Sequence, residues 1–293
     1  MKGIILINAY SKDQPWVRQA ERLKEEFSLL GVECDIVKND GFKAYIHGGK
    51  RISLYGDIDF AVYLDKDKYI SRVLEDCGVR LYNRHGAIRD CDDKFNTFIR
   101  LAESGLRLPD TLPGLLCYDK GERVSEDALD IIEDRLDYPV VVKTSYGSMG
   151  KGVYLCKSRA ELREASRALL NVPHIYQKFV SESYGKDIRV IVIGGRARAV
   201  MRRVNNGDFR SNAARGGTGE RVNISEEYTI YAEKCARLIG LDYCGVDLFE
   251  TPEGPVVCEV NSNAFFEEAE RATGINIARE YCKYIVNDVR SKG

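Results

Sequence analysis

Two carboxylates and one amide, spaced along one short stretch, are the residues of this sequence best suited to hold a metal ion. Residues 245–261 are predicted to form two strands joined by a Pro/Gly turn. Because successive side chains of a strand point to opposite faces, Glu259 and Asn261 share one face. A hairpin loop of about five residues would bring Asp247 onto the same face. The opposite, core-facing side is expected to hold Val256, Cys258 and Val260.

Three oxygen ligands at one point predict a site for a hard cation that keeps part of its water shell and binds phosphate, namely Mg²⁺. The alternative is that these residues are solvated surface groups beside a turn, since 30% of the chain is charged. Two further stretches of the chain favour the metal site.

The first of these is a glycine-rich loop between two predicted strands. The strands are residues 139–143 and 153–156, and the loop between them has glycines at positions 147, 150 and 152. Glycines let backbone N–H groups approach phosphate oxygens closely. The order strand–loop–strand and the lack of a G-x-x-x-x-G-K-[ST] pattern exclude a P-loop, so we expect a flap that folds over a nucleotide. Lys143 ends an apolar strand, where a bound anion would compensate its charge. A loose surface hairpin is the alternative.

The second stretch is rich in arginine and lacks lysine. Arginine without lysine favours planar, bidentate recognition of carboxylate or phosphate over a diffuse basic surface. Residues 207–217 within it are too polar for a core and are predicted to form a loop. The competing interpretation, an arginine loop that binds RNA, fits poorly with a net charge of −1. The arginines are Arg196, Arg198, Arg202, Arg203, Arg210, Arg215 and Arg221.

Composition limits the class of protein. A chain of 293 residues is long enough for roughly two domains, and its near-neutral charge argues against a general nucleic-acid or membrane-surface binder. The apolar run in residues 1–9 is too short for a signal peptide, and no apolar span of membrane length follows. The nine cysteines include no Cys-x-x-Cys pair, which predicts reduced thiols and a cytoplasmic location.

Elements that would position these residues alternate between strand and helix. Residues 1–86 predict a small domain with a parallel sheet, without the glycine-rich strand–helix turn of dinucleotide-binding folds. A helix beginning at about Asp92 or Asp93 and ending at Gly105 carries Lys94 in its first turn, where a nearby anion would offset the unfavourable helix dipole. Ser125 and Ser158 are predicted to begin two further helices. A strand over 172–180, a hairpin across Gly194–Gly195 and a C-terminal helix complete the chain.

Over about residues 90–285 the sequence resembles the RimK-type ATP-grasp ligases. The likeness rests on the hairpin with Val-Val-Lys143, the loop Asp-Phe-Arg-Ser-Asn-x-x-Arg-Gly-Gly and the pair Gly-Val-Asp247 and Glu259-Val-Asn261. The resemblance implies a mixed α/β fold: a small parallel α/β domain at 1–88, followed by two lobes, 89–178 and 179–293, that clamp the nucleotide. It also implies roles for individual residues.

ATP is the implied cofactor. Its phosphates and adenine would meet Lys94 and Lys143, under a flap that includes Gly147, Ser148 and Gly150. The adenine would lie against Gln177, Lys178, Phe179 and Val180. The ribose would meet Asp187. Two Mg²⁺ ions, which Mn²⁺ could replace, would be held by Asp247, Glu259 and Asn261. Arg203 would stabilise the transferring phosphoryl group. Nucleotide phosphate and substrate carboxylate would meet Arg210, Ser211, Asn212 and Arg215.

The implied reaction joins an amino acid, typically L-glutamate, to an acceptor carboxylate through an acylphosphate, and releases ADP and phosphate. The acceptor could be a small molecule, a peptide or a protein tail, and assembly into a homo-oligomer is left open. After Asn261 many such proteins continue with a small residue and Pro-Gly, whereas this chain has Ser262-Asn-Ala-Phe-Phe266. That departure leaves the acceptor and the added amino acid open. A kinase acting on a hydroxyl and a nucleotide-binding regulator are the alternative functions.

Overall fold

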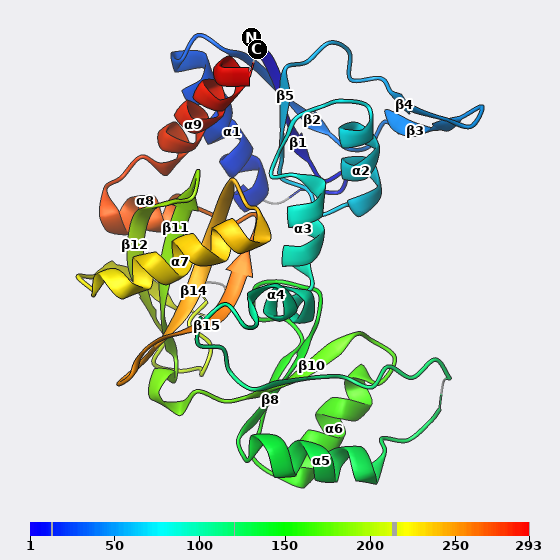
Figure 1. The fold of residues 1–293 in the computed structure, drawn as a ribbon, viewed down its shortest axis with the longest axis vertical. Coiled ribbons are helices and arrows are strands. Elements are labelled where there is room, and N and C mark those ends of the chain that lie inside the picture. The colour runs from blue at the N-terminus through cyan, green and yellow to red at the C-terminus, as the bar shows by residue number, and fades with distance from the viewer. Residues whose placement is uncertain (13, 120, 213–215, 293) are drawn as a thin grey trace.

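A computed structural model describes residues 1–12, 14–119, 121–212 and 216–292. Within these residues the strands form three sheets of four or five strands and one two-stranded sheet (Figure 1). The predicted mixed α/β class is confirmed. No helix in this part of the chain is long and apolar enough to cross a membrane.

The first sheet is parallel, in the order β2-β1-β5-β6. Strands β1 and β5 are buried along nearly their whole length, as is usual where both faces of a parallel sheet are covered. The parallel arrangement predicted for the N-terminal region is therefore confirmed. The strands are β1 (Lys2–Ile7), β2 (Glu33–Lys38), β5 (Phe60–Tyr63) and β6 (Leu81–Tyr82). The helices that connect them are α1 (Gln14–Leu29) and α2 (Lys68–Asp76).

A hairpin that the sequence analysis missed projects from this region (Figure 1). Its strands are β3 (Ala44–His47) and β4 (Lys50–Ser53). Gly48 and Gly49 form the turn with φ of +54° and +75°, the conformation that tight hairpin turns require. Most residues of both strands are exposed, so the chain lacks the alternation of buried and exposed residues that predicts a strand.

The second sheet is antiparallel, in the order β7-β10-β8-β9. One face packs against two helices in a separate apolar core. Ser125 and Ser158 accept hydrogen bonds at the starts of these helices, as predicted. The strands are β7 (Thr111–Pro113), β8 (Val140–Thr144), β9 (Val153–Cys156) and β10 (His174–Lys178). The helices are α5 (Glu126–Leu136) and α6 (Arg159–Leu169).

The third sheet is antiparallel, in the order β13-β12-β11-β14-β15. Helix α7 (Glu226–Ile239) packs on one face. Helices α8 (Glu267–Thr273) and α9 (Ile277–Lys292) pack on the other. The strands are β11 (Lys186–Ile193), β12 (Arg196–Val204), β13 (Thr218–Arg221), β14 (Tyr243–Thr251) and β15 (Gly254–Asn261). A short 3₁₀ turn, η1 (Ser181–Ser183), leads into β11.

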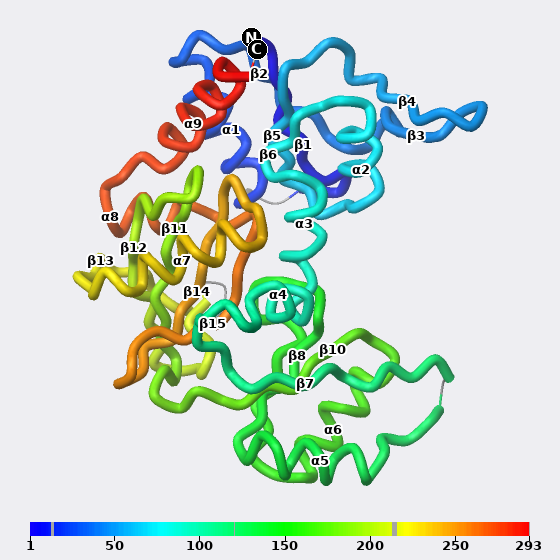
Figure 2. Tube along the Cα trace, in the orientation of Figure 1, coloured from blue at the N-terminus to red at the C-terminus, as the bar shows by residue number. Residues whose placement is uncertain are grey.

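Two short helices, α3 (His85–Asp92) and α4 (Lys94–Leu101), connect the first sheet to the rest. Asp93 caps α4 by accepting hydrogen bonds from the backbone N–H groups of Phe95 and Asn96. Lys94 is therefore in the first turn, as predicted, although α4 ends before Gly105. Helix α3 was not predicted. Figure 2 shows the second sheet, drawn in green, at the opposite end of the molecule from the first.

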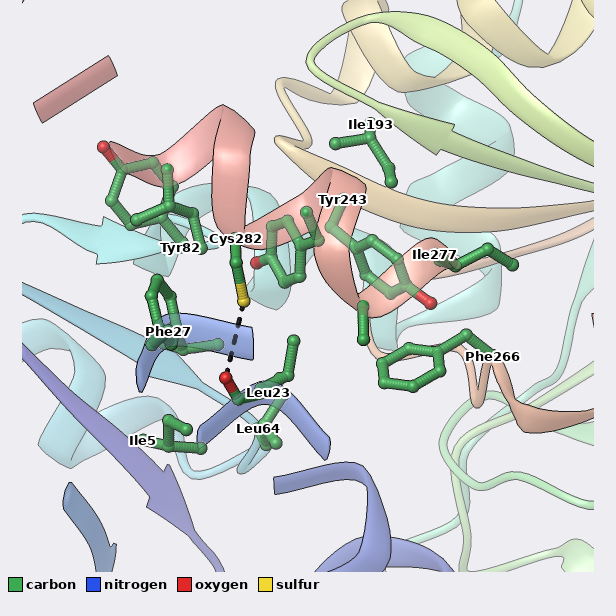
Figure 3. Packing of buried hydrophobic residues seen from close by; sticks show 14 of the residues in the cluster. Ile5, Leu23, Phe27, Leu64, Tyr82, Ile193, Tyr243, Phe266, Ile277 and Cys282 are labelled. Carbon is green, nitrogen blue, oxygen red and sulfur yellow. Dashed lines mark hydrogen bonds between the residues drawn. The ribbon is translucent and has the colours of Figure 1, made fainter. Parts of the chain in front are cut away.

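The first and third sheets share one apolar core (Figure 3). In it, α1 meets α9: the thiol of Cys282 donates to the carbonyl oxygen of Leu23 at 3.5 Å. Tyr243 of β14 stacks on Tyr281 of α9 with ring centroids 4.6 Å apart. The C-terminal helix thus completes the packing of the N-terminal region, while the boundaries proposed at residues 88 and 178 stay predictions.

The side chain of Asn83 joins the first sheet to the third by hydrogen bonds. We expect removal of this side chain to destabilise the whole fold. Its side chain is 2% exposed and makes four hydrogen bonds of 2.7–2.9 Å with backbone groups of Asp242, Tyr243 and Ser262. Each buried group left without a partner costs about 1–3 kcal/mol. Asn83→Ala should therefore lower the free energy of unfolding by at least about 3 kcal/mol, measured by urea denaturation.

Asn171→Ala is the matched control, since exposed Asn171 also donates two hydrogen bonds to backbone carbonyls. It should change the free energy of unfolding by less than about 1 kcal/mol. Equal effects of the two substitutions would contradict a joining role for Asn83.

Candidate functional site

The β14–β15 hairpin brings the predicted metal ligands to one cleft. Asp247 lies directly opposite Glu259 in the strand register, and both line the cleft. The turn holds only two residues, because Thr251 pairs with Gly254, so the predicted longer loop is wrong. With so short a turn, regular pairing would place Asp247 opposite Cys258. A β-bulge supplies the extra residue that restores the pairing with Glu259.

The same bulge changes the face that Cys258 occupies. Val257 and Val260 pack in the core beneath α7, whereas Cys258 lines the cleft beside Glu259. An extra residue in one strand shifts the alternation of side chains by one position. The predicted core position of Cys258 is therefore wrong, and the predicted cleft position of Glu259 is right.

Asp247 belongs to a network of buried charges. Arg189 donates one hydrogen bond to each of its carboxylate oxygens, both at 2.7 Å, and Arg203 Nη2 lies 2.7 Å from Oδ2. Arg203 also donates to both oxygens of Asp187, at 2.7 and 2.6 Å, and the Ser211 hydroxyl donates to Asp187. Burial alone would raise the pKa of Asp247, but the two guanidinium groups hold that pKa below its ordinary value.

Glu259 reaches the cleft from β15, and Asn261 of the same strand contacts Asp247. Lys94 Nζ lies 3.5 Å from Glu259 Oε1 and donates to the carbonyl oxygen of Gly147 at 3.0 Å. The Asn261 amide donates to Asp247 Oδ2 at 3.4 Å. Glu259 is thus the anion that offsets the unfavourable position of Lys94 in its helix, and Lys94 links α4, the glycine loop and β15.

Lys143 is a buried cation held by neutral groups. It is 7% exposed, its Nζ donates to Gln177 Oε1 at 2.8 Å and lies 5.8 Å from the centre of the Phe98 ring. Among the residues that the structure describes, it forms no ion pair. Burial lowers the pKa of Lys143 below its ordinary value. A buried ammonium without a counter-ion is costly, so this end of the cleft favours an anionic ligand.

The glycine loop covers the cleft and is held there by Arg210. Gly147, Ser148 and Gly150 line the cleft, and the two glycines have φ of +125° and +67°. Arg210 Nη1 donates to the carbonyl oxygens of Gly150 at 3.0 Å and Val153 at 3.3 Å. The loop predicted from residues 144–152 is thus attached to the predicted arginine loop, so the alternative of a loose surface hairpin is wrong.

An apolar end completes the cleft, which has a volume of about 810 Å³ including its open mouth. Apolar walls suit the faces of a ring system, while Lys143 and the glycine loop suit an anion. The apolar walls are formed by Val141, Val153, Phe179, Val180, Phe209 and Phe249.

Nearly all the predicted site residues that the structure describes line this one cleft. Asn261 is the exception, and it reaches the site through Asp247. Arg215 lies outside the described residues. The following line the cleft: Lys94, Lys143, Gly147, Ser148, Gly150, Gln177, Lys178, Phe179, Val180, Asp187, Arg203, Arg210, Ser211, Asn212, Asp247 and Glu259. Their individual roles stay predictions.

Several cleft residues were missed by the sequence analysis. Strand alternation contained a signal for Phe249, and also for Arg189, which contacts Asp247 without lining the cleft: they lie two residues after Asp247 and Asp187 and so share their faces. No pattern signalled Cys258, which depends on the bulge. The other missed residues that line the cleft are Val141, Lys151, Val153, Lys186 and Phe209.

The donor set fits a hard divalent cation. Each carboxylate has about four acceptor positions, and three of those on Asp247 are taken by Arg189 and Arg203, so an ion there would replace the 3.4 Å contact from Asn261. Within the described residues no group of three or more His, Cys, Asp or Glu side chains could hold a metal. An ion between Asp247, Glu259 and Asn261 therefore needs water or phosphate oxygens to complete its shell, which is how Mg²⁺ is usually bound.

Comparison with known proteins agrees with this geometry. Residues 91–285 match the model of the RimK-like ATP-grasp domain. The chain is 33% identical over 293 residues to N-acetylaspartylglutamate synthase A of Homo sapiens, covering 94% of this chain and 73% of that protein. It is 34% identical over 292 residues to a probable alpha-L-glutamate ligase of Teredinibacter turnerae, covering 94% of each.

The fold is also similar to that of a solved ligase. D-alanine–D-alanine ligase of Bacillus anthracis superposes with a TM-score of 0.76 at 17% identity, over 100% of both chains. The expected ATP-grasp fold and the expected class of enzyme, an ATP-dependent ligase that forms C–N bonds, are confirmed. The chain belongs to the RimK-like ATP-grasp family.

Proposed function

We propose that this ligase joins the amine of an amino acid, L-glutamate or a similar one, to the carboxylate of an acceptor. The γ-phosphoryl group of ATP passes to a carboxylate oxygen, giving an acylphosphate and ADP. The amine then attacks the carbonyl carbon, loses a proton and displaces phosphate. The names of the relatives support glutamate as the added amino acid. The acceptor could be a small molecule, a peptide or a protein tail.

The cationic side chains of the cleft are the main support for this proposal. Lys143 lies at the anion-favouring end and Lys94 beside Glu259, so both would bind the phosphates of ATP. Arg203 is fixed in place by two carboxylates and would stabilise charge that develops on the transferring phosphoryl group. Such fixed charges act without reorganising during the reaction, which makes them effective in a water-poor site.

The rest of the cleft would position the nucleotide. The adenine would lie between the apolar walls, against Gln177–Val180, with Asp187 near the ribose. Arg210, Ser211 and Asn212 would meet the phosphates beside the glycine loop, to which Arg210 is hydrogen-bonded. Arg215 stays a prediction from sequence as a partner of the substrate carboxylate, since a forked guanidinium suits that group.

An ATP-grasp enzyme uses ATP together with a divalent metal ion. We propose two Mg²⁺ ions, replaceable by Mn²⁺, bound by Asp247, Glu259 and Asn261. Bound there, they would neutralise phosphate charge and bring the reacting oxygens together. The Glu259 carboxylate, 3.5 Å from Lys94 Nζ, would be a ligand shared by both ions.

A substrate screen tests the reaction. The purified protein is incubated with ATP and Mg²⁺, with each amino acid and each candidate carboxylate, singly and paired, and ADP is measured. We expect ADP release that needs both substrates, and hydroxylamine in place of the amine should give a hydroxamate. ADP release with a hydroxyl compound alone would instead support the kinase alternative, and nucleotide binding without release would support a regulator.

Glu259→Gln should abolish most of the turnover. The side chain lies off the core face, so the fold should persist, while loss of its charge should lower kcat by at least about 10²-fold. Glu253→Gln is the matched control, since Glu253 sits in the turn of the same hairpin with its side chain 68% exposed. A folded Glu259→Gln protein with the ADP release of Glu253→Gln would remove this site from the mechanism.

Arg210→Lys should weaken nucleotide binding. Lysine keeps the charge but cannot hold Asp208 bidentately while reaching the carbonyl oxygens of Gly150 and Val153. We expect the Kd of a non-hydrolysable ATP analogue to rise by about 10-fold or more, measured by calorimetry. Arg198→Lys, at an exposed position of the same arginine run, should bind like the parent protein. Unchanged affinity in Arg210→Lys would mean that Arg210 does not hold the loop closed.

A further inference from the structure

A second cavity lies at the carboxyl ends of strands β1 and β5. It has a volume of about 690 Å³ including its open mouth, and its walls include Tyr10, Trp16 and Asp65. The carboxyl ends of parallel strands are the edge at which α/β sheets usually bind ligands. The first sheet therefore offers a binding site apart from the nucleotide cleft.

Asp65 brings a buried negative charge to this cavity. Its residue is 6% exposed, and its oxygens accept hydrogen bonds from three neutral donors: the amides of Asn8 at 3.1 Å and Asn39 at 3.3 Å, and the backbone N–H of Lys66 at 2.7 Å. No described cation forms an ion pair with it, since the ammonium of Lys66 pairs with Asp92 instead. Burying a carboxylate without a counter-ion is costly. A bound cation would offset that cost.

Aromatic side chains favour an organic cation over a metal ion. Trp16 contacts Phe265 edge-on with ring centroids 4.4 Å apart, and Tyr10 is 85% exposed although it lines the cavity. Aromatic faces attract ammonium groups and cover the carbon atoms attached to them. One carboxylate flanked by amide donors supplies too few oxygens for a metal shell. The chemistry of this cavity matches an alkylammonium group.

Two connections place the cavity next to the predicted metal ligands. Asn263 donates to the carbonyl oxygen of Leu64 at 2.7 Å, and it follows Asn261 by two residues, which span at most about 7 Å. On the other side, Lys66 pairs with Asp92, two residues before Lys94, which contacts Glu259. Two short segments thus connect the cavity to the residues predicted to hold the metal ions.

We propose that this cavity binds the amino-acid substrate, with Asp65 accepting hydrogen bonds from its ammonium group and Trp16 and Tyr10 covering its carbon atoms. The inference rests on the proposed function. It means that residues at the edge of the first sheet select a substrate with a free, protonated amine. The amine binds as an ammonium ion and passes one proton to the Asp65 carboxylate before its nitrogen attacks the carbonyl carbon; a second proton leaves to solvent as the C–N bond forms. Phe265, in the segment that departs from the family pattern, would shape the cavity through its contact with Trp16.

The single tryptophan of the sequence makes the first test direct, because Trp16 lines this cavity and is the sole source of tryptophan emission. With Mg²⁺ and a non-hydrolysable ATP analogue bound, the protein is titrated with L-glutamate and with each other non-aromatic amino acid. The N-acetyl derivative of the tightest binder is then titrated. We expect that amino acid to change the emission and its N-acetyl form to bind at least about 10-fold more weakly. No emission change with any amino acid, or equal binding of the two forms, would overturn the proposal.

Asp65→Asn provides the second test, since it removes the charge and keeps the shape. It should raise both the Kd and the KM of the amino acid by at least about 10-fold and leave the Kd of the ATP analogue within about twofold. Asp67→Asn is the matched control: Asp67 lies two residues away and caps α2, and asparagine caps a helix equally well. Parental amino-acid affinity in folded Asp65→Asn would overturn the proposal.

The comparison of free and N-acetylated amino acid needs no variant, so it decides the matter even if Asp65→Asn fails to fold. The two proposals also fail separately. Lack of ADP release with every amino acid and carboxylate pair would overturn the ligase reaction. Loss of discrimination between a free and a blocked amine would overturn the assignment of this cavity alone.

Discussion

Buried salt bridges around Arg203 are the constraint on which the nucleotide cleft depends. Arg203 pairs with Asp187, and Arg189 with Asp247, in each case as direct cross-strand neighbours. Arg203 then reaches across to Asp247 and joins the two pairs. Removing a charge from water costs several kcal/mol, and a buried ion whose partner is lost is strongly destabilising. The order and register of β11, β12 and β14 are therefore fixed by charge as well as by the apolar packing on either side of the sheet.

The cleft is assembled from elements that belong to different sheets, and polar side chains join them. The second sheet supplies Lys143 and the glycine loop, and the third supplies Asp247 and Glu259. Lys94 and Arg210 each contact the glycine loop and one of the other elements. The second and third sheets are consequently linked through residues that line the cleft. A nucleotide that binds there interacts with a cover that is already in place, rather than with a free loop.

Sequence patterns predicted the helices, the strands and the residues of the site well, but they predicted the local geometry poorly. The core strands, the helix caps at Ser125 and Ser158 and the convergence of Asp247 with Glu259 follow from periodicity and residue chemistry. The face that Cys258 occupies could not be predicted in this way, because a bulge inserts one residue in a strand and arises from pairing with the neighbouring strand. The hairpin of β3 and β4 was missed because its strands are mostly exposed, and α3 was missed too. Arg189 was overlooked although alternation places it beside Asp187.

The core that α1 shares with α9 has a consequence for the order in which the protein can fold. Cys282 and Leu23 touch across 259 positions of sequence. At about 5–20 residues per second, a ribosome needs roughly 10–50 s to travel that distance. Throughout that time α1 can pack on the first sheet, but the side of α1 that meets α9 remains uncovered on the nascent chain. The packing of the N-terminal region is therefore completed only after the C-terminal helix has been made.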